Sequence, residues 1–187
     1  MKKLVFILLI VIGFQSCVQN NPLHPTEIKD VPAKTMGTIE FDFPVEEEVY
    51  VPIYSDIFHR TRDFKILLAA TLSIRNTSKS DTLFIKEVDY YDSAGIFVRD
   101  YIKEPIYLNP LETIDYVIDE EDEVGGSGAN FLITWGANKN LKPVFQAVMV
   151  GGIGQQGITF TTEGTTVTPE KEISKTVSDS TQRDRKK

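Results

Sequence analysis

Short hydrophobic runs, separated by polar turn residues, extend over the chain from about residue 49 to residue 164. Residues 113–118 show the pattern most clearly, because Ile114, Tyr116 and Ile118 alternate with polar or smaller neighbours. Alternation with a period of two is typical of a half-buried β-strand. No window combines helical periodicity with capping residues. The pattern therefore predicts an all-β chain of short strands joined by turns.

Seven to nine such strands follow one another at regular spacing, and aromatic and β-branched residues are frequent in them. Pro52 places the first strand at a sheet edge or a bulge, because proline cannot donate a ladder hydrogen bond. Residues 92–95 read Asp-Ser-Ala-Gly and predict a tight turn that joins two strands into a hairpin. Many short strands with regular turns predict an antiparallel β-sandwich. The predicted strands are residues 49–58, 64–76, 82–91, 96–102, 113–118, 130–135, 143–150 and 157–164.

The N-terminus carries the strongest targeting signal in the chain. Lys2 and Lys3 precede an apolar run at residues 4–12, which is shorter than the roughly 20 residues that a membrane-spanning helix needs. A positive start followed by a short apolar run is typical of a secretory signal peptide. Cys17 is the one cysteine of the chain and follows the small residue Ser16. An ordinary secretory signal with a chance cysteine is the alternative interpretation.

The surroundings of Cys17 resemble the lipobox of bacterial lipoproteins, whose cysteine is acylated and becomes the mature N-terminus. Phe14 stands where leucine is usual, and Gln15 is bulky for its position. The resemblance implies that residues 1–16 are a lipoprotein signal peptide and that Cys17 carries a lipid anchor. Membrane association and a location in the cell envelope follow. Val18 and Gln19 replace the aspartate that can retain a lipoprotein at the inner membrane, which favours the outer membrane.

The rest of the chain divides into three parts. Residues 17–44 are polar and contain spaced prolines, which predicts a lipidated cysteine followed by a flexible tether. Residues 45–168 form the predicted sandwich domain. Residues 169–187 are charged and lack aromatic residues, which predicts a disordered tail. The formal net charge of −7 disfavours nucleic-acid binding, because neutralising phosphates requires a basic surface.

Two glycine-rich stretches resemble nucleotide-binding loops at first sight. Gly152, Gly154 and Gly157 stand in Gly-x-Gly-x-x-Gly order, but that fingerprint requires a following helix whose N-terminus binds the pyrophosphate. Here Ile158 and Phe160 alternate with threonines, as in a strand. The glycines therefore predict a connection between two strands, with positive φ at some of them. The second stretch, Gly-Gly-Ser-Gly, lacks the lysine and the helix of a phosphate loop. We expect no cofactor.

Signals for catalysis and for metal binding are weak. There is no Gly-x-Ser-x-Gly nucleophile elbow, and the one cysteine is predicted to be lipidated. We therefore expect no enzymatic activity. The carboxylates of Asp89 and Asp92 leave a glycosidase open as an alternative. The acidic run at residues 119–123 offers oxygen ligands for calcium but lacks the spacing of an EF-hand loop, so we predict no metal site and leave calcium open.

The longer pattern resembles a known family. The runs VYVPIYSDIF, GGSGANFLITW and AVMVGGIGQQGITFT together are similar to a bacterial family catalogued only as a domain of unknown function, number 3124, over residues 49–162. The resemblance implies an exported protein, often a lipoprotein, and no assigned chemistry. The order of strand, polar turn, strand and hairpin at residues 71–95 also resembles immunoglobulin-type accessory domains. By this fold-level analogy we expect an immunoglobulin-like antiparallel β-sandwich of seven to nine strands.

The predicted turns and strand ends contain tyrosine, carboxylate and amide side chains that could contact a partner. A tyrosine that faces outward from a sheet can stack on a sugar or pack against a protein. We therefore predict an interaction module that binds another envelope protein or a glycan, with a glycan-hydrolysing protein as the alternative. Asp81-Thr82-Leu83 and Asp92-Ser93-Ala94 also resemble bacterial O-glycosylation acceptors, which we leave open. The candidate binding rim consists of Asp89, Tyr91, Asp92, Ser127, Asn130, Gln155 and Gln156.

Overall fold

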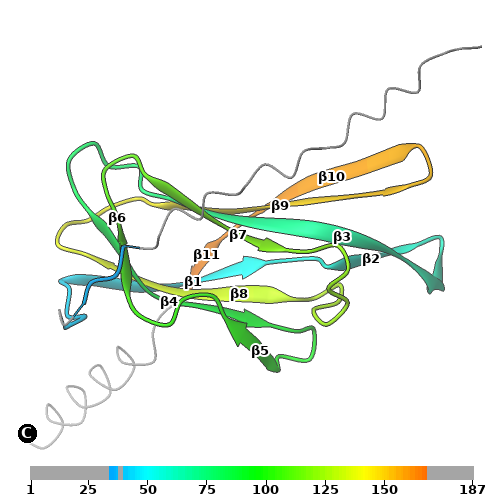
Figure 1. The fold of residues 1–187 in the computed structure, drawn as a ribbon, viewed down its shortest axis with the longest axis horizontal. Coiled ribbons are helices and arrows are strands. Elements are labelled where there is room, and N and C mark those ends of the chain that lie inside the picture. The colour runs from blue at the N-terminus through cyan, green and yellow to red at the C-terminus, as the bar shows by residue number, and fades with distance from the viewer. Residues whose placement is uncertain (1–33, 38–39, 168–187) are drawn as a thin grey trace, which may run out of the picture. The chain divides into compact units, whose positions relative to one another are not determined.

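The computed structural model describes residues 34–37 and 40–167. In this part of the chain there is no helix, and eleven strands form two antiparallel sheets (Figure 1). The described residues therefore include no helix long and apolar enough to cross a membrane. The predicted signal peptide, Cys17, most of the predicted tether and the predicted tail lie outside the described residues. The all-β prediction is confirmed.

One sheet has six strands in the order β11-β1-β8-β4-β5, with β6 also paired to β4. The three central strands are longest, and each buries alternate residues against the other sheet. The strands are β1 (Val45–Pro52), β4 (Leu83–Tyr91), β5 (Phe97–Asp100), β6 (Ile106–Leu108), β8 (Asn130–Ala137) and β11 (Thr165–Val167).

The other sheet has five strands in the order β10-β9-β3-β2, with β7 also paired to β3. Its longest strand, β3, pairs with β2 near its start and with β7 and β9 along the rest. The hairpin of β2 and β3 and the hairpin of β9 and β10 extend at the same end of the domain (Figure 1). The strands are β2 (Asp56–His59), β3 (Thr61–Arg75), β7 (Thr113–Ile118), β9 (Val144–Ile153) and β10 (Gln156–Glu163).

The prediction of one strand over residues 49–58 is wrong, because the chain changes sheets within it. β1 ends at Pro52, and β2 starts in the other sheet at Asp56. Between them, the backbone N–H of Ile53 donates to the carbonyl of Ala129 at 2.8 Å, and that of Ser55 donates to Gly126 at 3.1 Å. The N–H groups of this connection are therefore bonded to carbonyls of the loop before β8 and not to a neighbouring strand. This break and two strands of three residues raise the number of strands from the predicted seven to nine to eleven.

A single hydrophobic core lies between the sheets and includes residues from both. Trp135, Tyr90 and Phe131 are its largest fully buried side chains. Ile118 is buried, and Ile114 and Tyr116 are partly buried against the core, so the predicted face of β7 is confirmed. Full burial of a side chain of this kind stabilises a fold by about 1.5–3 kcal/mol. The core therefore fixes which face of each strand points outward.

Part of the segment predicted to be a tether contacts the six-stranded sheet. Thr35 forms an isolated bridge with Ile106, and Met36 is buried. Phe43 stacks on Phe84 with ring centroids 4.3 Å apart. A Cβ at Gly136 would lie 2.8 Å from the Phe43 ring, so the glycine leaves room for this close approach. Residues 34–37 and 40–44 thus belong to the folded domain.

One end of the sandwich is closed by the buried side chain of Asn76, and we call this arrangement the asparagine junction. Asn76 follows β3, and its Nδ2 lies 2.8 Å, 3.2 Å and 3.0 Å from the carbonyl oxygens of Asp81, Leu108 and Asn109. Its Oδ1 accepts a hydrogen bond of 3.0 Å from the backbone N–H of Ser78. A buried amide with this many partners links the connection between β3 and β4 to the end of β6.

Candidate functional site

The structure divides the predicted rim into three groups at different places. Asp89, Tyr91 and Asn130 lie on the outer face of the six-stranded sheet. Asp92 and Ser127 lie in two loops that contact each other. Gln155 and Gln156 lie at the tip of the β9–β10 hairpin, in the other sheet. The rim is therefore not one site, and each group has its own surroundings.

Strand register brings the first group together with residues that the sequence analysis did not select. One row across the sheet joins Tyr50, Leu132, Asp89 and Asp100, and the next joins Pro52, Asn130, Tyr91 and Phe97. Tyr50 is 37% exposed and Phe97 is 51% exposed. These eight residues form one surface, the acidic sheet face: Tyr50, Pro52, Asp89, Tyr91, Phe97, Asp100, Asn130 and Leu132.

Carboxylates determine the electrostatic character of the acidic sheet face. Partial burial raises the pKa of the Asp89 carboxyl, and the carboxylates of Glu87 and Asp100 raise it further. Burial also raises the pKa of Tyr91, with additional contributions from Asp89 and Glu48. A surface on which neighbouring carboxylates raise the pKa of Asp89 attracts cationic groups.

Rings on the acidic sheet face contact each other as well as solvent. The rings of Tyr91 and Phe97 meet edge to face, with centroids 5.7 Å apart and planes at 75°. Aromatic side chains present a large apolar area, and the tyrosine hydroxyl adds a polar group. The face therefore combines apolar rings with free carboxylate oxygens, which suits a protein surface or a sugar.

Asp92 stabilises the turn between β4 and β5. Its Oδ1 accepts hydrogen bonds of 2.8 Å from the backbone N–H groups of Ala94 and Ile96. Gly95 has a φ of 75°, which a glycine adopts without strain. The predicted Asp-Ser-Ala-Gly turn is thereby confirmed, and the Asp92 carboxylate contributes to its local structure.

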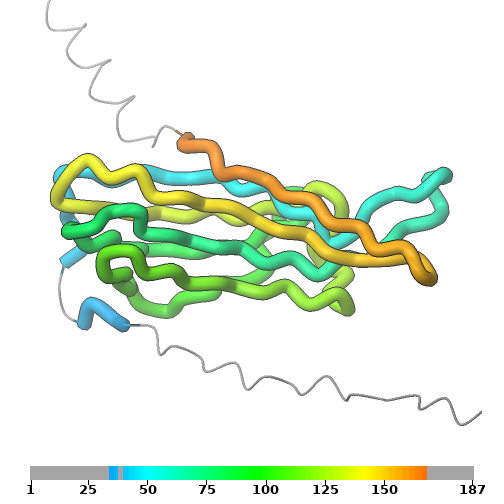
Figure 2. The backbone as a smooth tube through the Cα atoms, turned by 90° about the horizontal axis from the view of Figure 1, so that it is seen from above, coloured from blue at the N-terminus to red at the C-terminus, as the bar shows by residue number. Residues whose placement is uncertain are grey.

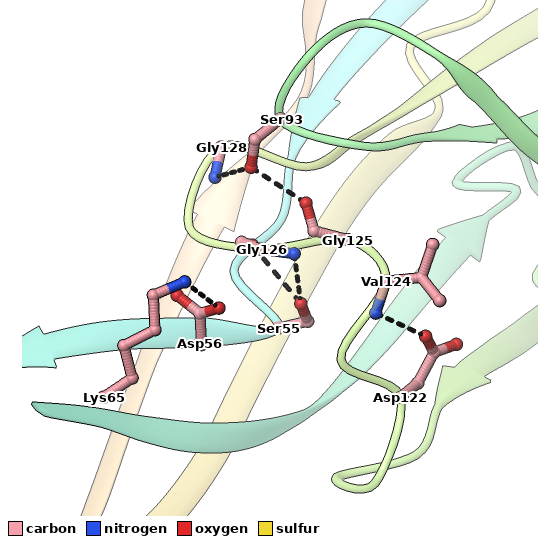
Figure 3. Close-up of polar contacts among 9 residues, drawn as sticks. All are labelled: Ser55, Asp56, Lys65, Ser93, Asp122, Val124, Gly125, Gly126 and Gly128. Atoms are coloured by element: carbon pink, nitrogen blue, oxygen red, sulfur yellow. Dashed lines mark hydrogen bonds and ion pairs between the residues drawn. The ribbon is translucent and has the colours of Figure 1, made fainter. Parts of the chain in front are cut away.

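Ser55 and Ser93 hold the glycine-rich loop before β8 from two sides, and we call this arrangement the serine clamp (Figure 3). The backbone N–H of Gly126 donates to Ser55 Oγ at 2.6 Å. Ser93 Oγ donates to the carbonyl of Gly125 and accepts from the N–H of Gly128, both at 2.8 Å. A glycan on the Ser93 oxygen would remove the hydrogen that Ser93 donates to the carbonyl of Gly125. Ser127 lies within the loop thus held.

The serine clamp explains why its glycines are needed. Gly126 has a φ of 78°. A Cβ at Gly125 would overlap the hydroxyl of Tyr90, and one at Gly128 would lie 3.3 Å from Ser93 Oγ. The Gly-Gly-Ser-Gly stretch therefore lets the backbone of this loop approach the turn between β4 and β5 closely. Repeated glycine was the sequence signal, but its partners could not be identified without the fold.

Two buried polar atoms beside the clamp have no hydrogen-bond partner among the described residues: Asp56 Oδ1 and the Tyr90 hydroxyl. The other oxygen of Asp56 pairs with Lys65 Nζ at 2.7 Å (Figure 3). Burial is the main reason that the pKa of Tyr90 is raised. None of these three residues belongs to the predicted rim, because nothing in the local sequence pattern marks them.

Gln155 and Gln156 lie at a two-residue hairpin turn. Ile153 pairs with Gln156, and Gly154 has a φ of 59° between them. Positive φ at the first turn position is typical of a type II′ hairpin. The glycines thus connect two strands, as predicted from the alternation that follows them.

The acidic run at residues 119–123 is partly used within the fold. Asp122 forms an ion pair with Arg99, and its Oδ1 accepts a 3.2 Å hydrogen bond from the N–H of Val124. An open pocket of about 610 Å³ lies beside this ion pair. Among the described residues, no group of three or more His, Cys, Asp or Glu side chains could hold a metal ion.

A second pocket, of about 350 Å³, lies beside the loop between β8 and β9. Trp135 and Phe145 reach it from the core, and Glu47, Glu163 and Lys142 contribute charge. None of the predicted rim residues lines either pocket.

Comparison with known proteins gives a family without an assigned activity. No curated protein matches the chain. A solved structure described as "Crystal Structure of Thermotoga maritima 1070" is 12% identical, with a TM-score of 0.37, and the match covers 64% of this chain and 92% of that chain. The model of the family described as Protein of unknown function (DUF3124) matches residues 46–167, which confirms the resemblance. Because this match spans more than half of the chain, the protein belongs to the DUF3124 family.

Proposed function

We propose that this protein is a membrane-anchored envelope lipoprotein whose β-sandwich binds a partner through the acidic sheet face. The signal peptide and the lipobox-like surroundings of Cys17 support the anchor. A place in the cell envelope, with the outer membrane favoured, rests on the same residues. The domain itself has no proposed catalytic role.

The observation that carries the binding proposal is the meeting of Asp89, Tyr91 and Asn130 on one outward face. They lie beside Tyr50 and Phe97, so apolar rings and carboxylates share one face of the sheet. Interfaces commonly combine aromatic side chains with a polar rim. Free carboxylates favour a partner with complementary positive charge. A protein of the envelope with a basic surface fits this description best.

A glycan is the second candidate partner, supported by the same rings. Tyr91 and Phe97 present ring surface to solvent, and the Asp89 carboxylate is beside them to accept hydrogen bonds from hydroxyl groups. Asp89 and Asp100 are directly paired across β4 and β5. They lie on an open sheet face and line neither pocket, so we propose glycan binding rather than hydrolysis.

We also propose that the two antiparallel sheets form an immunoglobulin-like sandwich. The chain passes repeatedly between the sheets, and Trp135 is buried at the centre of the core. Immunoglobulin-like domains share Greek-key connections and a buried tryptophan. A solved structure with the strand order of Figure 1 that aligns with such domains over its whole core would support this assignment.

The anchor is tested by mass spectrometry of the membrane-extracted protein beside a Cys17→Ser variant. A lipid mass on Cys17, lost together with membrane association in the variant, supports the proposal. An unmodified protein that is released from the cell contradicts it.

The binding face is tested by placing a photo-crosslinking amino acid at Phe97 in cells. A matched control carries it at Val117, which is also exposed but lies on the other sheet. A protein adduct specific to Phe97, weakened by Asp89→Lys, supports a basic protein partner. Retention on isolated envelope glycans, lost in a Tyr91→Ala variant, supports the glycan instead. Equal adducts from both positions contradict the assignment of the face.

A further inference from the structure

We propose that β10 pairs with β10 of a second copy of this chain, which joins two five-stranded sheets across a two-fold axis. This inference is independent of the acidic sheet face, because β10 belongs to the other sheet. It rests on the free edge of β10, on the uncharged sequence around that edge and on the register that β10 can form with itself.

β10 is an edge strand with an unbroken row of backbone groups. It pairs with β9 over all eight of its residues, from Gln156 to Glu163, without a register shift. No described strand pairs with its other side (Figure 2). Alternate N–H and C=O groups along that side therefore face outward, where they form a template for another strand.

The other sheet edges carry features that hinder strand addition. Among the described strands, β7 pairs only with β3, and it carries Asp115 in its middle. β5 has a register shift opposite Tyr91, and Arg99 and Asp100 lie within it. β2 has a register shift after Phe58 and carries Asp56. β11 and β6 have three residues each. Charges, bulges and short length are the usual ways of protecting an edge, and β10 shows none of them before Glu163.

The charge distribution makes this edge the place where a second copy can bind with little repulsion. The chain carries a formal net charge of −7, so two copies repel each other over most of their surfaces. Residues 144–162 contain no charged side chain. Val150, beside β10 on the outer face of the same sheet, is 52% exposed. Two acidic chains can therefore approach each other at this hairpin without bringing negative charges close together.

The sequence of β10 is also compatible with pairing to itself in antiparallel orientation. With Thr159 opposite its own copy, Ile158 lies opposite Phe160 twice, and Gly157 lies opposite Thr161 twice. Ile158 and Phe160 are partly buried on the core side of the sheet, where the second copy would cover them further. Threonine pairs and aromatic–β-branched pairs are favourable neighbours across strands.

The experiment uses the chain expressed from its whole sequence with Cys17→Ser, which removes the one native thiol. Sedimentation equilibrium over a wide concentration range measures dimerisation of this chain, of Thr159→Lys and of Val117→Lys. Val117 is the matched control, because it is exposed on the same sheet but lies on β7. Circular dichroism confirms that each variant is folded.

We expect a dimer whose Kd rises at least about tenfold in Thr159→Lys, because two lysines would face each other, and stays unchanged in Val117→Lys. In a separate variant, Thr159→Cys, oxidation should give a disulfide-linked dimer, because paired residues in antiparallel strands lie at disulfide distance. A chain that stays monomeric at every concentration and forms no such disulfide overturns the proposal. A dimer that Val117→Lys weakens as much as Thr159→Lys also overturns it, because the sheet face would then be the interface.

Discussion

The two ends of the sandwich are closed by hydrogen bonds of different kinds. At the asparagine junction, one buried amide contacts three carbonyls and one N–H group, so its polar atoms have partners. At the serine clamp, two hydroxyls hold glycine backbone, and Asp56 Oδ1 and the Tyr90 hydroxyl beside them have no partner among the described residues. One end therefore depends on a single side chain, whereas the other depends on two serine hydroxyls and on glycines that leave room for close contact.

The largest effect is expected from Asn76→Ala, which removes the side chain on which the asparagine junction depends. Several buried backbone groups would lose their partner, so we expect a loss of about 3 kcal/mol in the free energy of unfolding. Urea denaturation measures this loss. Asn140→Ala is the matched control, because Asn140 is exposed, and it should change stability by less than about 0.5 kcal/mol. Similar values for the two variants would show that the junction is not decisive.

Gly125→Ala should destabilise the serine clamp by about 2 kcal/mol, because the new Cβ would overlap the Tyr90 hydroxyl. Tyr90→Phe alone should be nearly neutral, since that hydroxyl has no partner among the described residues. The double variant should therefore be more stable than the sum of the single effects predicts. A double-mutant cycle by urea denaturation checks this, and strict additivity would refute the steric explanation.

Ser93→Ala should cost about 1 kcal/mol, because it removes the hydroxyl that contacts Gly125 and Gly128. The effect should be local, so amide hydrogen exchange should accelerate in the glycine-rich loop and stay unchanged in β3. Ser127→Ala is the control within the same loop, and its side chain has no hydrogen bond to the described residues. Faster exchange throughout the domain would mean that the clamp supports the whole core.

The asparagine junction should lose stability in acid through Glu112. Its pKa is lowered by a hydrogen bond from Lys34 and by the backbone N–H of Asn109. Because the pKa of Glu112 is lower in the folded state, its ionisation stabilises the fold fully at pH values above the usual pKa of 4.5. This stabilisation is lost as the pH falls through the pKa of the folded state. Glu112→Gln should therefore cost about 0.5 kcal/mol at neutral pH and nothing in acid. Urea denaturation across the pH range measures the difference, and a pH-independent cost would contradict the ion-pair explanation.

The pKa of Asp89, on the acidic sheet face, is shifted in the opposite direction, so its effect on stability should have the opposite sign. Its raised pKa means that the fold disfavours the charged carboxylate. Asp89→Asn should therefore stabilise the protein by about 0.5 kcal/mol at neutral pH, because it removes a like-charge pair with Asp100 across the strands. This gain should shrink as the pH falls through the raised pKa and vanish below the usual value of 3.8. The same denaturation series detects it, and a loss of stability at neutral pH would be the contrary result.

Local patterns predicted most strands and turns of this fold. The range of β7 and its inward face follow from alternation alone, and so does the strand after the hairpin glycines. The sheet change after Pro52 could not be predicted, because the backbone N–H of Ile53 there bonds to Ala129, far along the chain. Three-residue strands such as β6 are too short to show a period.

The candidate site required information that a linear pattern does not contain. Asp89 and Tyr91 could be chosen because they alternate with buried neighbours on one strand. Tyr50 and Phe97 join them only through register across β1, β8, β4 and β5. In the sequence, Asn76 is an ordinary turn residue. Its importance appears only in the fold, which brings two other segments to its side chain. Such contacts follow from the order of strands in the sheets. The alternation of residues along one strand predicts only which of its side chains face outward.

The position of β1 between β8 and β11 has a consequence for the order in which the chain can fold. Val49 pairs with Ile133 on one side and with Thr166 on the other, so the first long strand has no partner close to it along the chain. Native contacts at such sequence separations slow folding, because large loops must close before any of the pairing is gained. During synthesis, β1 emerges early and receives its last neighbour only when residues 165–167 have been made. The domain therefore completes its larger sheet only after all its other described strands have been made, and a chain that stops before β11 leaves one side of β1 open to aggregation.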